Sequence, residues 1–256
     1  MTNEKQIPDR TFDPIAEAKL LLRSTRAAAL ATLAAPSGDP FASLVNVATA
    51  PDGSPILLLS RLAAHTRHLD TDSRMSLLFY SALNMPSGGD PLTHPRLTIL
   101  GRAERVSDSA ERLGLRARFL ARHPKSSLYA DFADFAFFRV AIETAHLNGG
   151  FGRAAGVAAA SLLTSLEGAA DLVAEEGGLL AEIESAAPQM ANDLAAAYGG
   201  SGESWHAIGF DPEGIDLSDG ERLLRITFAT LVSTPAELQQ TVAALLAEAR
   251  RGSTPA

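Results

Sequence analysis

Residues 57–79 read LLLSRLAAHTRHLDTDSRMSLLF, and this stretch decides how the rest of the chain is interpreted. Two apolar runs, residues 56–59 and 75–79, have the length and the boundaries of buried strands. The turn between them is rich in hydroxyl and cationic side chains: Ser60, Arg61, His65, Thr66, Arg67 and His68. Free backbone N–H groups and the helix dipole favour an anion where such a turn begins a helix. The pattern therefore fits either a phosphate-binding turn or a solvated connecting helix.

Other short apolar runs, on both sides of this stretch, also have the length of strands. They cover residues 27–33, 42–48, 96–106 and 135–142. The dipeptide Asp52-Gly53 is a hairpin signal, and helices are predicted at 13–24, which Asp13 caps, and at 108–122. Six short strands, few of them separated by full helices, predict an antiparallel barrel rather than a doubly wound sheet.

The composition shifts to Ala, Gly and Ser from about Arg153 onward, which indicates a linker. Beyond it the pattern predicts a small α+β module, with helices at 179–198 and 235–250 and strands at 205–210 and 222–228. We therefore divide the chain into a barrel domain (1–153), a linker (154–174) and a small α+β domain (175–256).

The composition is that of a globular protein, with 46% hydrophobic and 20% charged residues among 256. No apolar run approaches the ~20 residues that span a bilayer, and the polar start has no signal-peptide core, so we expect a cytoplasmic protein without a membrane partner. Cysteine is absent, which excludes disulfides, thiolate nucleophiles and Cys-type metal sites. We expect no metal site, because no carboxylate lies beside His65 and His68 at helical spacing within that turn.

The net charge of −8 is unevenly distributed along the chain. Residues 171–256 hold 4 Lys+Arg and 14 Asp+Glu, whereas residues 1–170 hold 18 and 16. Nucleic-acid binding depends on neutralising phosphates, so the acidic C-terminal part argues against a nucleic-acid partner. The near-neutral N-terminal part is the better host for a small anionic ligand.

A glycine-rich motif, residues 146–154 (HLNGGFGRA), follows the last predicted barrel strand. Its glycines permit a backbone that approaches a planar ligand closely. Gly150, Gly152 and Gly156 could also belong to a dinucleotide-binding fingerprint, but the residues that follow are Ala-rich and helix-like rather than a parallel strand with an acidic end. A tight turn into the linker is the simpler interpretation of the glycines.

Four motifs together resemble one known family. They are the S-R-L-x-x-H-T-x-x-L turn, the L-N-G-G-F-G-R-A motif, residues 90–101 (DPLTHPRLTILG) and residues 209–217 (GFDPEGIDL). The chain resembles the FMN-binding split barrels related to pyridoxamine 5′-phosphate oxidase, in the haem-utilisation branch with its fused C-terminal domain of unknown function. This resemblance implies an α+β protein: an N-terminal six-stranded antiparallel split β-barrel followed by a small C-terminal α+β domain.

The same resemblance implies a flavin site. Four residues would hold the FMN phosphate: Ser60, Arg61, His65 and Thr66. Ser43 and Asn46 would lie along the isoalloxazine ring, and Phe151, Gly152 and Arg153 would close the site from the partner subunit of a homodimer. His65 and Thr66 stand where the oxidase has an Arg and a Lys, so this site would carry less fixed positive charge.

The resemblance thus implies an FMN-binding protein that works as a flavin-dependent oxidoreductase, with no catalytic group assigned. The alternative is a non-enzymatic haem- or partner-binding regulatory protein on the same fold. Relatives of the second domain often carry a His-Met-Asn-x-Asp-His run, where this chain has residues 189–194 (QMANDL). Imidazole is the usual neutral ligand of haem iron, which leaves His94 and His146 near the site. We therefore expect weak or no haem binding.

Overall fold

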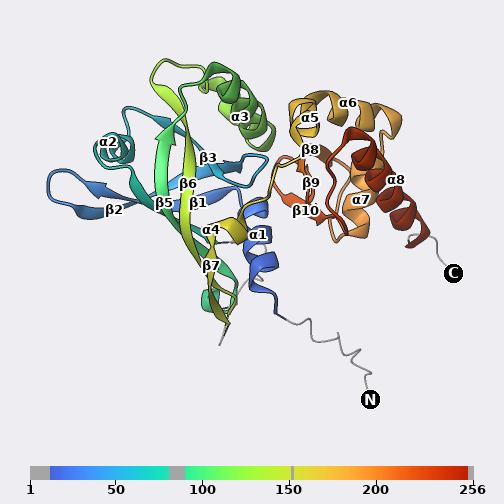
Figure 1. Cartoon of the computed structure of the whole chain (residues 1–256), viewed down its shortest axis with the longest axis horizontal. Coiled ribbons are helices and arrows are strands. Elements are labelled where there is room, and N and C mark those ends of the chain that lie inside the picture. The colour runs from blue at the N-terminus through green and yellow to red at the C-terminus, as the bar shows by residue number, and fades with distance from the viewer. Residues whose placement is uncertain (1–11, 81–89, 151–152, 253–256) are drawn as a thin grey trace.

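The computed structural model describes residues 12–80, 90–150 and 153–252. In this part of the chain, seven strands form the larger sheet: β1 (Ala27–Ala34), β2 (Asp39–Thr49), β3 (Pro55–Ser60), β4 (Arg74–Tyr80), β5 (Arg96–Arg105), β6 (Phe135–Asn148) and β7 (Ala154–Ala158). Their order is β3-β2-β1-β4-β5-β6-β7, and an additional pairing of β3 with β6 closes the first six strands into a barrel (Figure 1). Every pairing is antiparallel, which confirms the predicted six-stranded barrel.

The barrel interior is built by alternate residues of neighbouring strands. Leu30, Leu77 and Ile99 face one another across β1, β4 and β5, and each is fully buried. Side chains alternate between the two faces of a strand, so their neighbours in sequence point outward. Between Leu100 and Gly101 the β5–β6 register shifts, and a Cβ atom on Gly101 would lie 2.2 Å from the carbonyl oxygen of Ala141. Only glycine fits that position of the barrel.

Helices and short turns surround the barrel. They are α1 (Pro14–Ser24), α2 (Ala64–Thr71), α3 (Ser109–Arg122), and the 3-10 turns η1 (Pro91–Thr93) and η2 (Pro124–Leu128). The start of α1 is the predicted one, because the Asp13 carboxylate accepts hydrogen bonds from the N–H groups of Ile15 and Ala16. Helix α3 packs Phe119 against Phe137 of β6 in a separate apolar cluster outside the main core.

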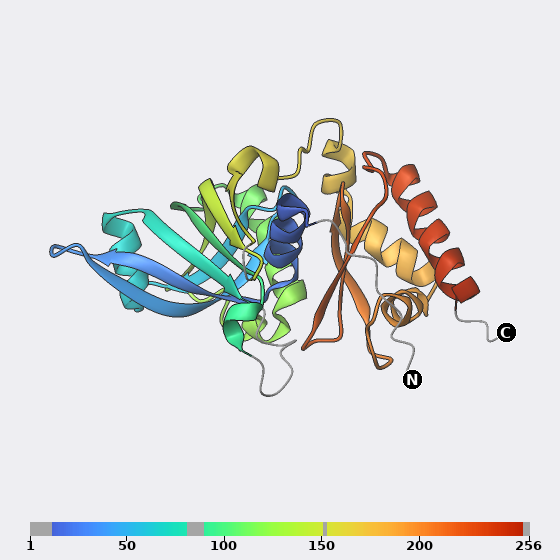
Figure 2. The ribbon, with the colours of Figure 1, turned by 90° about the horizontal axis from the view of Figure 1, so that it is seen from below.

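The C-terminal part is a mixed α+β module, as predicted. It contains β8 (His206–Asp211), β9 (Gly214–Ser218), β10 (Leu223–Thr227), α5 (Ala170–Ala174), α6 (Glu176–Ala186), α7 (Met190–Ala197) and α8 (Pro235–Gly252). Figure 2 shows its three-stranded sheet between its own helices on one side and α1 of the barrel domain on the other. The residues assigned to the linker form β7, α4 (Ala159–Leu162) and α5, and β7 pairs with β6.

Two elements of this module differ from the sequence prediction. The predicted helix 179–198 is two helices, because Pro188 lies between α6 and α7 and cannot continue a helix interior. Strand β9 was not predicted at all. Its middle residue, Asp216, is charged and yet only 3% exposed, so a local pattern of hydrophobic alternation does not reveal it.

The two faces of the small sheet have opposite chemistry. Phe210, Ile215 and Ile226 form a row that packs into the module's own apolar core. On the other face, Asp216 pairs in register with Arg225, toward the barrel domain. The sheet therefore meets its helices through apolar contacts and the barrel through buried charges.

Candidate functional site

The predicted phosphate-binding turn lies where β3 ends and α2 begins. The N-cap of α2 is Ala63, whose side chain makes no capping hydrogen bond. Since the first N–H groups of a helix have no partner within the helix, those of α2 remain available to a ligand. The geometry is thus that of an uncapped helix N-terminus beside the barrel, as the sequence predicted.

The structure brings Ser43 and His65 together at this helix. Ser43 projects from β2, and its Oγ lies 3.0 Å from Nδ1 of His65. Burial, with a smaller contribution from the nearby His68, lowers the pKa of His65 below its ordinary value. At neutral pH the imidazole is therefore uncharged and works as a hydrogen-bonding group rather than as a cation.

Thr66, the next residue, is the clearest unsatisfied group in this region. Its side chain is fully buried, and its Oγ1 has no hydrogen-bond partner among the described residues. Buried polar atoms in native proteins nearly always have a partner, so a hydroxyl of this kind calls for a ligand or an ordered water.

Ser60 and Arg61 are engaged within the chain itself. The Ser60 hydroxyl donates to Oδ2 of Asp134 at 2.7 Å, and the Arg61 guanidinium donates to the carbonyl of Ala133 at 2.9 Å. Asp134 was not identified from the sequence, and it places a carboxylate beside the predicted anion site. No sequence signal indicates it, because 74 positions separate Asp134 from Ser60.

A second hydroxyl–imidazole pair anchors α2 to the barrel. Thr32 of β1 lies 3.0 Å from Nδ1 of His68, whose ring contacts the ring of Phe41 edge-on at a centroid distance of 5.2 Å. His65 and His68 are three residues apart and so share one face of α2. Both rings therefore fasten the same face of the helix to neighbouring strands.

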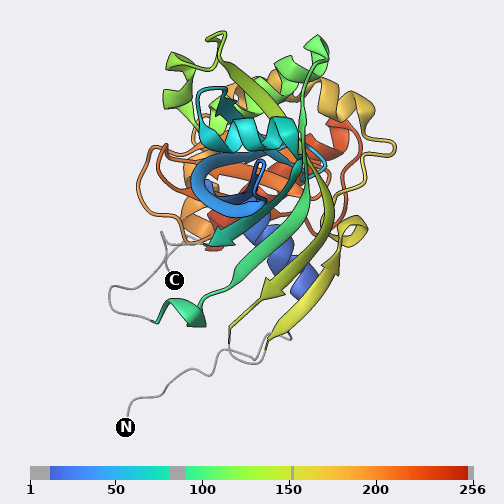
Figure 3. The same cartoon turned by 90° about the vertical axis from the view of Figure 1, so that its left-hand side faces the viewer.

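The remaining predicted site residues lie elsewhere. Asn46 is exposed on β2, opposite Ala27 of β1. Arg153 is exposed just before β7, with its guanidinium 5.7 Å from the ring centre of Phe12. Figures 1 and 3 place the start of β7 and helix α2 at opposite ends of the barrel. Phe151 and Gly152 lie outside the described residues.

Several apolar side chains lie together on the outer face of the barrel, next to the polar Ser76 and Thr98. We call this group the exposed apolar face and define it by Ala29, Ala31, Ala42, Leu44, Leu78 and Leu100. Leu44, Ala29 and Leu78 form one row across β2, β1 and β4, and the Leu44 side chain is 78% exposed. His146 extends the same row through β5 onto β6, where it is exposed.

Within the described residues, no group of three or more His, Cys, Asp or Glu side chains is arranged to hold a metal ion. Nor does any helix of the described part have the length and apolarity needed to cross a bilayer. His94, the other candidate haem ligand, is partly buried beside η1.

Three proteins of known sequence or structure are informative for comparison. A protein of unknown function from Agrobacterium tumefaciens is 32% identical, with a TM-score of 0.81 over 95% of this chain and 100% of its own. A haem-binding protein from Mycobacterium smegmatis is 25% identical, with a TM-score of 0.55 over 94% of this chain and 99% of its own. The chloroplastic non-canonical heme oxygenase HOZ of Arabidopsis thaliana is 34% identical over 130 residues, which is 50% of this chain.

This chain spans only 38% of the length of the Arabidopsis relative. A sequence model of one family, described as pyridoxamine 5′-phosphate oxidase, matches residues 15–149. These residues include the six barrel strands and α2, and they make up more than half of the chain. The family resemblance seen in the sequence, including its haem-utilisation branch, is thereby confirmed. The chain belongs to the pyridoxamine 5′-phosphate oxidase family.

Proposed function

We propose that this protein is a homodimer that binds FMN at α2, and that it works as a flavin-dependent oxidoreductase. The observation that carries the proposal is the buried, unpartnered Oγ1 of Thr66 in the first turn of an uncapped helix. Together with the Ser43–His65 pair, it offers a hydroxyl, an imidazole and backbone N–H groups to one anionic group. The membership of the oxidase family supports flavin as the ligand.

Nearby charges set the strength of this site. The guanidinium groups of Arg61 and Arg67 donate to backbone carbonyls, of Ala133 and Leu62, so these hydrogen bonds do not neutralise their charge. The carboxylate of Asp134 offsets part of this positive potential, and the neutral His65 adds none. Phosphate would therefore be held mainly by hydrogen bonds, and we expect FMN to bind reversibly.

The exposed apolar face supports the dimer. Its Leu44 and Leu100 are 78% and 47% exposed, and large apolar side chains gathered on one exposed face favour an interaction site. A two-fold axis on this face would bury the same residues of both copies. Because the start of β7 and helix α2 lie at opposite ends of the barrel within one chain, we expect the partner's Arg153 to approach α2 across this axis.

When FMN is bound, the isoalloxazine ring supplies the redox chemistry. The residues of this chain then bind the phosphate through Thr66 and α2, and orient His65 through Ser43. The face between two copies excludes water from the ring. No described side chain is assigned as a general acid or base.

A comparison of FMN with riboflavin, which lacks the phosphate, tests the α2 site. Thr66→Val keeps the shape of the side chain and removes its hydroxyl, so FMN affinity should fall about tenfold, as for one hydrogen bond to a charged group. Riboflavin affinity should not change, and Thr71→Val on the exposed side of the same helix is the matched control. Quenching of flavin fluorescence measures both. Equal losses for FMN and riboflavin, or no loss for FMN, would place the phosphate elsewhere.

A second candidate function is haem binding, which the relatives favour. The Mycobacterium smegmatis protein is a haem-binding protein, and the Arabidopsis protein is a non-canonical haem oxygenase. These two relatives count against our expectation of weak haem binding. His146 is the best placed ligand, because it is exposed on the edge of the exposed apolar face. A Soret band that shifts with one equivalent of hemin and is lost in His146→Ala would favour haem over FMN.

A further inference from the structure

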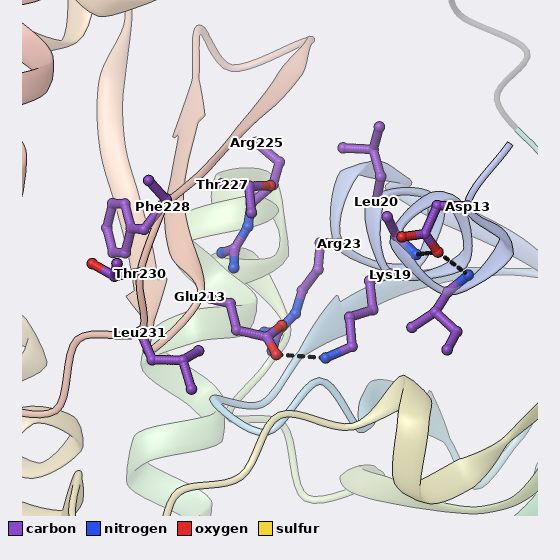
Figure 4. Close-up of a pocket in the computed structure, with 13 residues that line it drawn as sticks. Asp13, Lys19, Leu20, Arg23, Glu213, Arg225, Thr227, Phe228, Thr230 and Leu231 are labelled. Carbon is purple, nitrogen blue, oxygen red and sulfur yellow. Dashed lines mark hydrogen bonds and ion pairs between the residues drawn. The ribbon is translucent and has the colours of Figure 1, made fainter. Parts of the chain in front are cut away.

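A pocket of about 340 Å³ lies between the barrel domain and the C-terminal module, away from α2 (Figure 4). One wall is α1. The other is the end of β10 with the loop that follows it, residues 228–231. None of the predicted site residues lines this pocket.

The wall formed by α1 results from the two faces of this helix. Ala18, Leu21 and Leu22 are buried in the barrel core. Lys19 and Leu20 lie on the other side and line the pocket. Leu20 is 47% exposed on this amphipathic helix, so its side chain is open to solvent.

The opposite wall is mainly apolar, with Thr227 and Thr230 beside Phe228, Ala229 and Leu231, and hydrogen bonds hold it in place. Leu231 is 66% exposed at the pocket rim, while Phe228 is nearly buried beneath it. The N–H of Phe228 donates to the carbonyl of Glu213 at 2.8 Å, and the N–H of Val232 donates to the carbonyl of Pro212 at 2.9 Å. These bonds fix the loop against the turn between β8 and β9, so the wall is preformed.

The floor of the pocket carries one cation and one anion side by side. Nζ of Lys19 lies 2.5 Å from Oε1 of Glu213, and each side chain is 22% exposed (Figure 4). The Lys19 ammonium also reaches the carbonyl of Leu163 at 3.4 Å, and Oε2 of Glu213 accepts from Thr164 at 2.9 Å. An ammonium has three N–H donors and each carboxylate oxygen has a second lone pair, so Lys19 can donate one more hydrogen bond and Glu213 can accept one more.

The other charged groups of the lining already have partners within the chain. Arg23 and Arg225 are only 4% exposed in their side chains, and both pair with Asp211 behind the pocket. Asp13 caps α1. Lys19 and Glu213 are therefore the charged groups of the lining through which a ligand would be recognised.

We propose that this pocket binds an apolar α-amino acid. Its carboxylate contacts Lys19, its ammonium contacts Glu213, and its side chain lies against Leu231 on the Glu213 side of the pocket. A simple carboxylic acid would meet the repulsion of Glu213, and a simple amine would meet that of Lys19. A zwitterion complements both groups with charge-assisted hydrogen bonds. Since the two walls come from different parts of the chain, the ligand also strengthens their contact.

Calorimetric titration of the full chain with L-leucine and L-phenylalanine tests the proposal. Saturable binding is expected for both, with at least tenfold weaker binding of 4-methylpentanoate, 3-methylbutylamine and L-serine. Leu231→Asp should weaken L-leucine binding at least tenfold, because it puts a charge into the apolar wall. The matched control is Leu128→Asp, at a leucine that is 76% exposed on η2.

Glu213→Gln supplies a second, independent readout. It removes the charge that faces the ligand's ammonium, so the preference for L-leucine over 4-methylpentanoate should shrink at least tenfold while circular dichroism stays unchanged. No saturable binding of either amino acid up to about 10 mM would overturn the proposal, since affinities weaker than millimolar supply less than ~4 kcal/mol. Equal binding by the acid or the amine, or full affinity in Leu231→Asp, would overturn it as well.

Discussion

The replacement Asp211→Asn removes the charge at the centre of the contact between the two domains. Asp211 is fully buried, with its Oδ2 3.0 Å from a guanidinium nitrogen of Arg23 and 2.7 Å from one of Arg225. These are ion pairs rather than aligned hydrogen bonds, because Oδ2 has no partner of hydrogen-bond geometry. Asparagine has the same shape but would place an N–H₂ group or a neutral oxygen against two buried cations.

The expected cost is large. Breaking a buried ion pair by removing one partner typically costs about 3–5 kcal/mol, because the other charge stays buried and unpaired. The Oδ1 contacts, from the N–H of Glu213 at 2.8 Å and from Arg225 at 2.7 Å, survive the change. We therefore expect the free energy of unfolding to fall by about 3–5 kcal/mol. By comparison, Glu143→Gln breaks an exposed pair with Arg102 and should cost below about 1 kcal/mol.

The pH dependence of this loss gives a further check. Burial alone would raise the pKa of Asp211, but Arg23 and Arg225 outweigh it, so the pKa lies below its ordinary value. The ionised form therefore adds stability that is present above about pH 4 and is lost as the pH falls through the folded-state pKa. Urea unfolding should show a constant difference in stability between the two proteins above about pH 4, and this difference should shrink as the pH falls below about 4. A variant within about 1 kcal/mol of the wild type at pH 7 would refute the reasoning.

Three further predictions follow from other parts of the structure. Burial lowers the pKa of His123 to about 4, whereas the unfolded-state pKa of histidine is about 6.5. The free energy of unfolding should therefore fall by about 1.4 kcal/mol for each pH unit as the pH drops from about 6.5 to about 4. Urea unfolding of His123→Gln should lack that slope. Gly101→Ala should destabilise the barrel by more than about 2 kcal/mol in thermal unfolding, because the added Cβ would overlap the Ala141 carbonyl. Gly114→Ala in helix α3 is the control: its Cβ has room, so this change should not destabilise the protein. Leu44→Glu on the exposed apolar face should convert the proposed dimer to a monomer in light scattering without unfolding it; a persistent dimer would move the interface elsewhere.

Local patterns in the sequence were sufficient for the barrel. Short apolar runs separated by turn residues predicted its six strands, and the Asp13 cap predicted the start of α1. Strand β9 was missed because Asp216 is buried by arginines that come from elsewhere in the chain, such as Arg122, 94 positions away. A hydrophobic pattern does not contain such a partner. Pro188, by contrast, was a local signal for the break between α6 and α7.

At the candidate site, too, local features could be predicted from the sequence and contacts between distant residues could not. The turn at α2 was recognisable from its hydroxyls and cations, and the structure brings Ser43 to His65 across 22 positions. The carboxylate of Asp134 beside Ser60 was not predictable, because it depends on the closure of the barrel by β3 and β6. The roles of the nine predicted cofactor-binding residues stay predictions, and two of them, Phe151 and Gly152, lie outside the described residues.

An equilibrium titration of the purified protein with FMN tests the central proposal most directly. We predict saturable binding of one FMN per chain, with a shifted flavin absorbance spectrum and with displacement by inorganic phosphate, which would compete for Thr66 and the N-terminus of α2. Hemin, titrated in the same way, serves as the comparison ligand. Failure of FMN to saturate the protein, together with saturable hemin binding at one equivalent, would contradict the account and assign the site to haem.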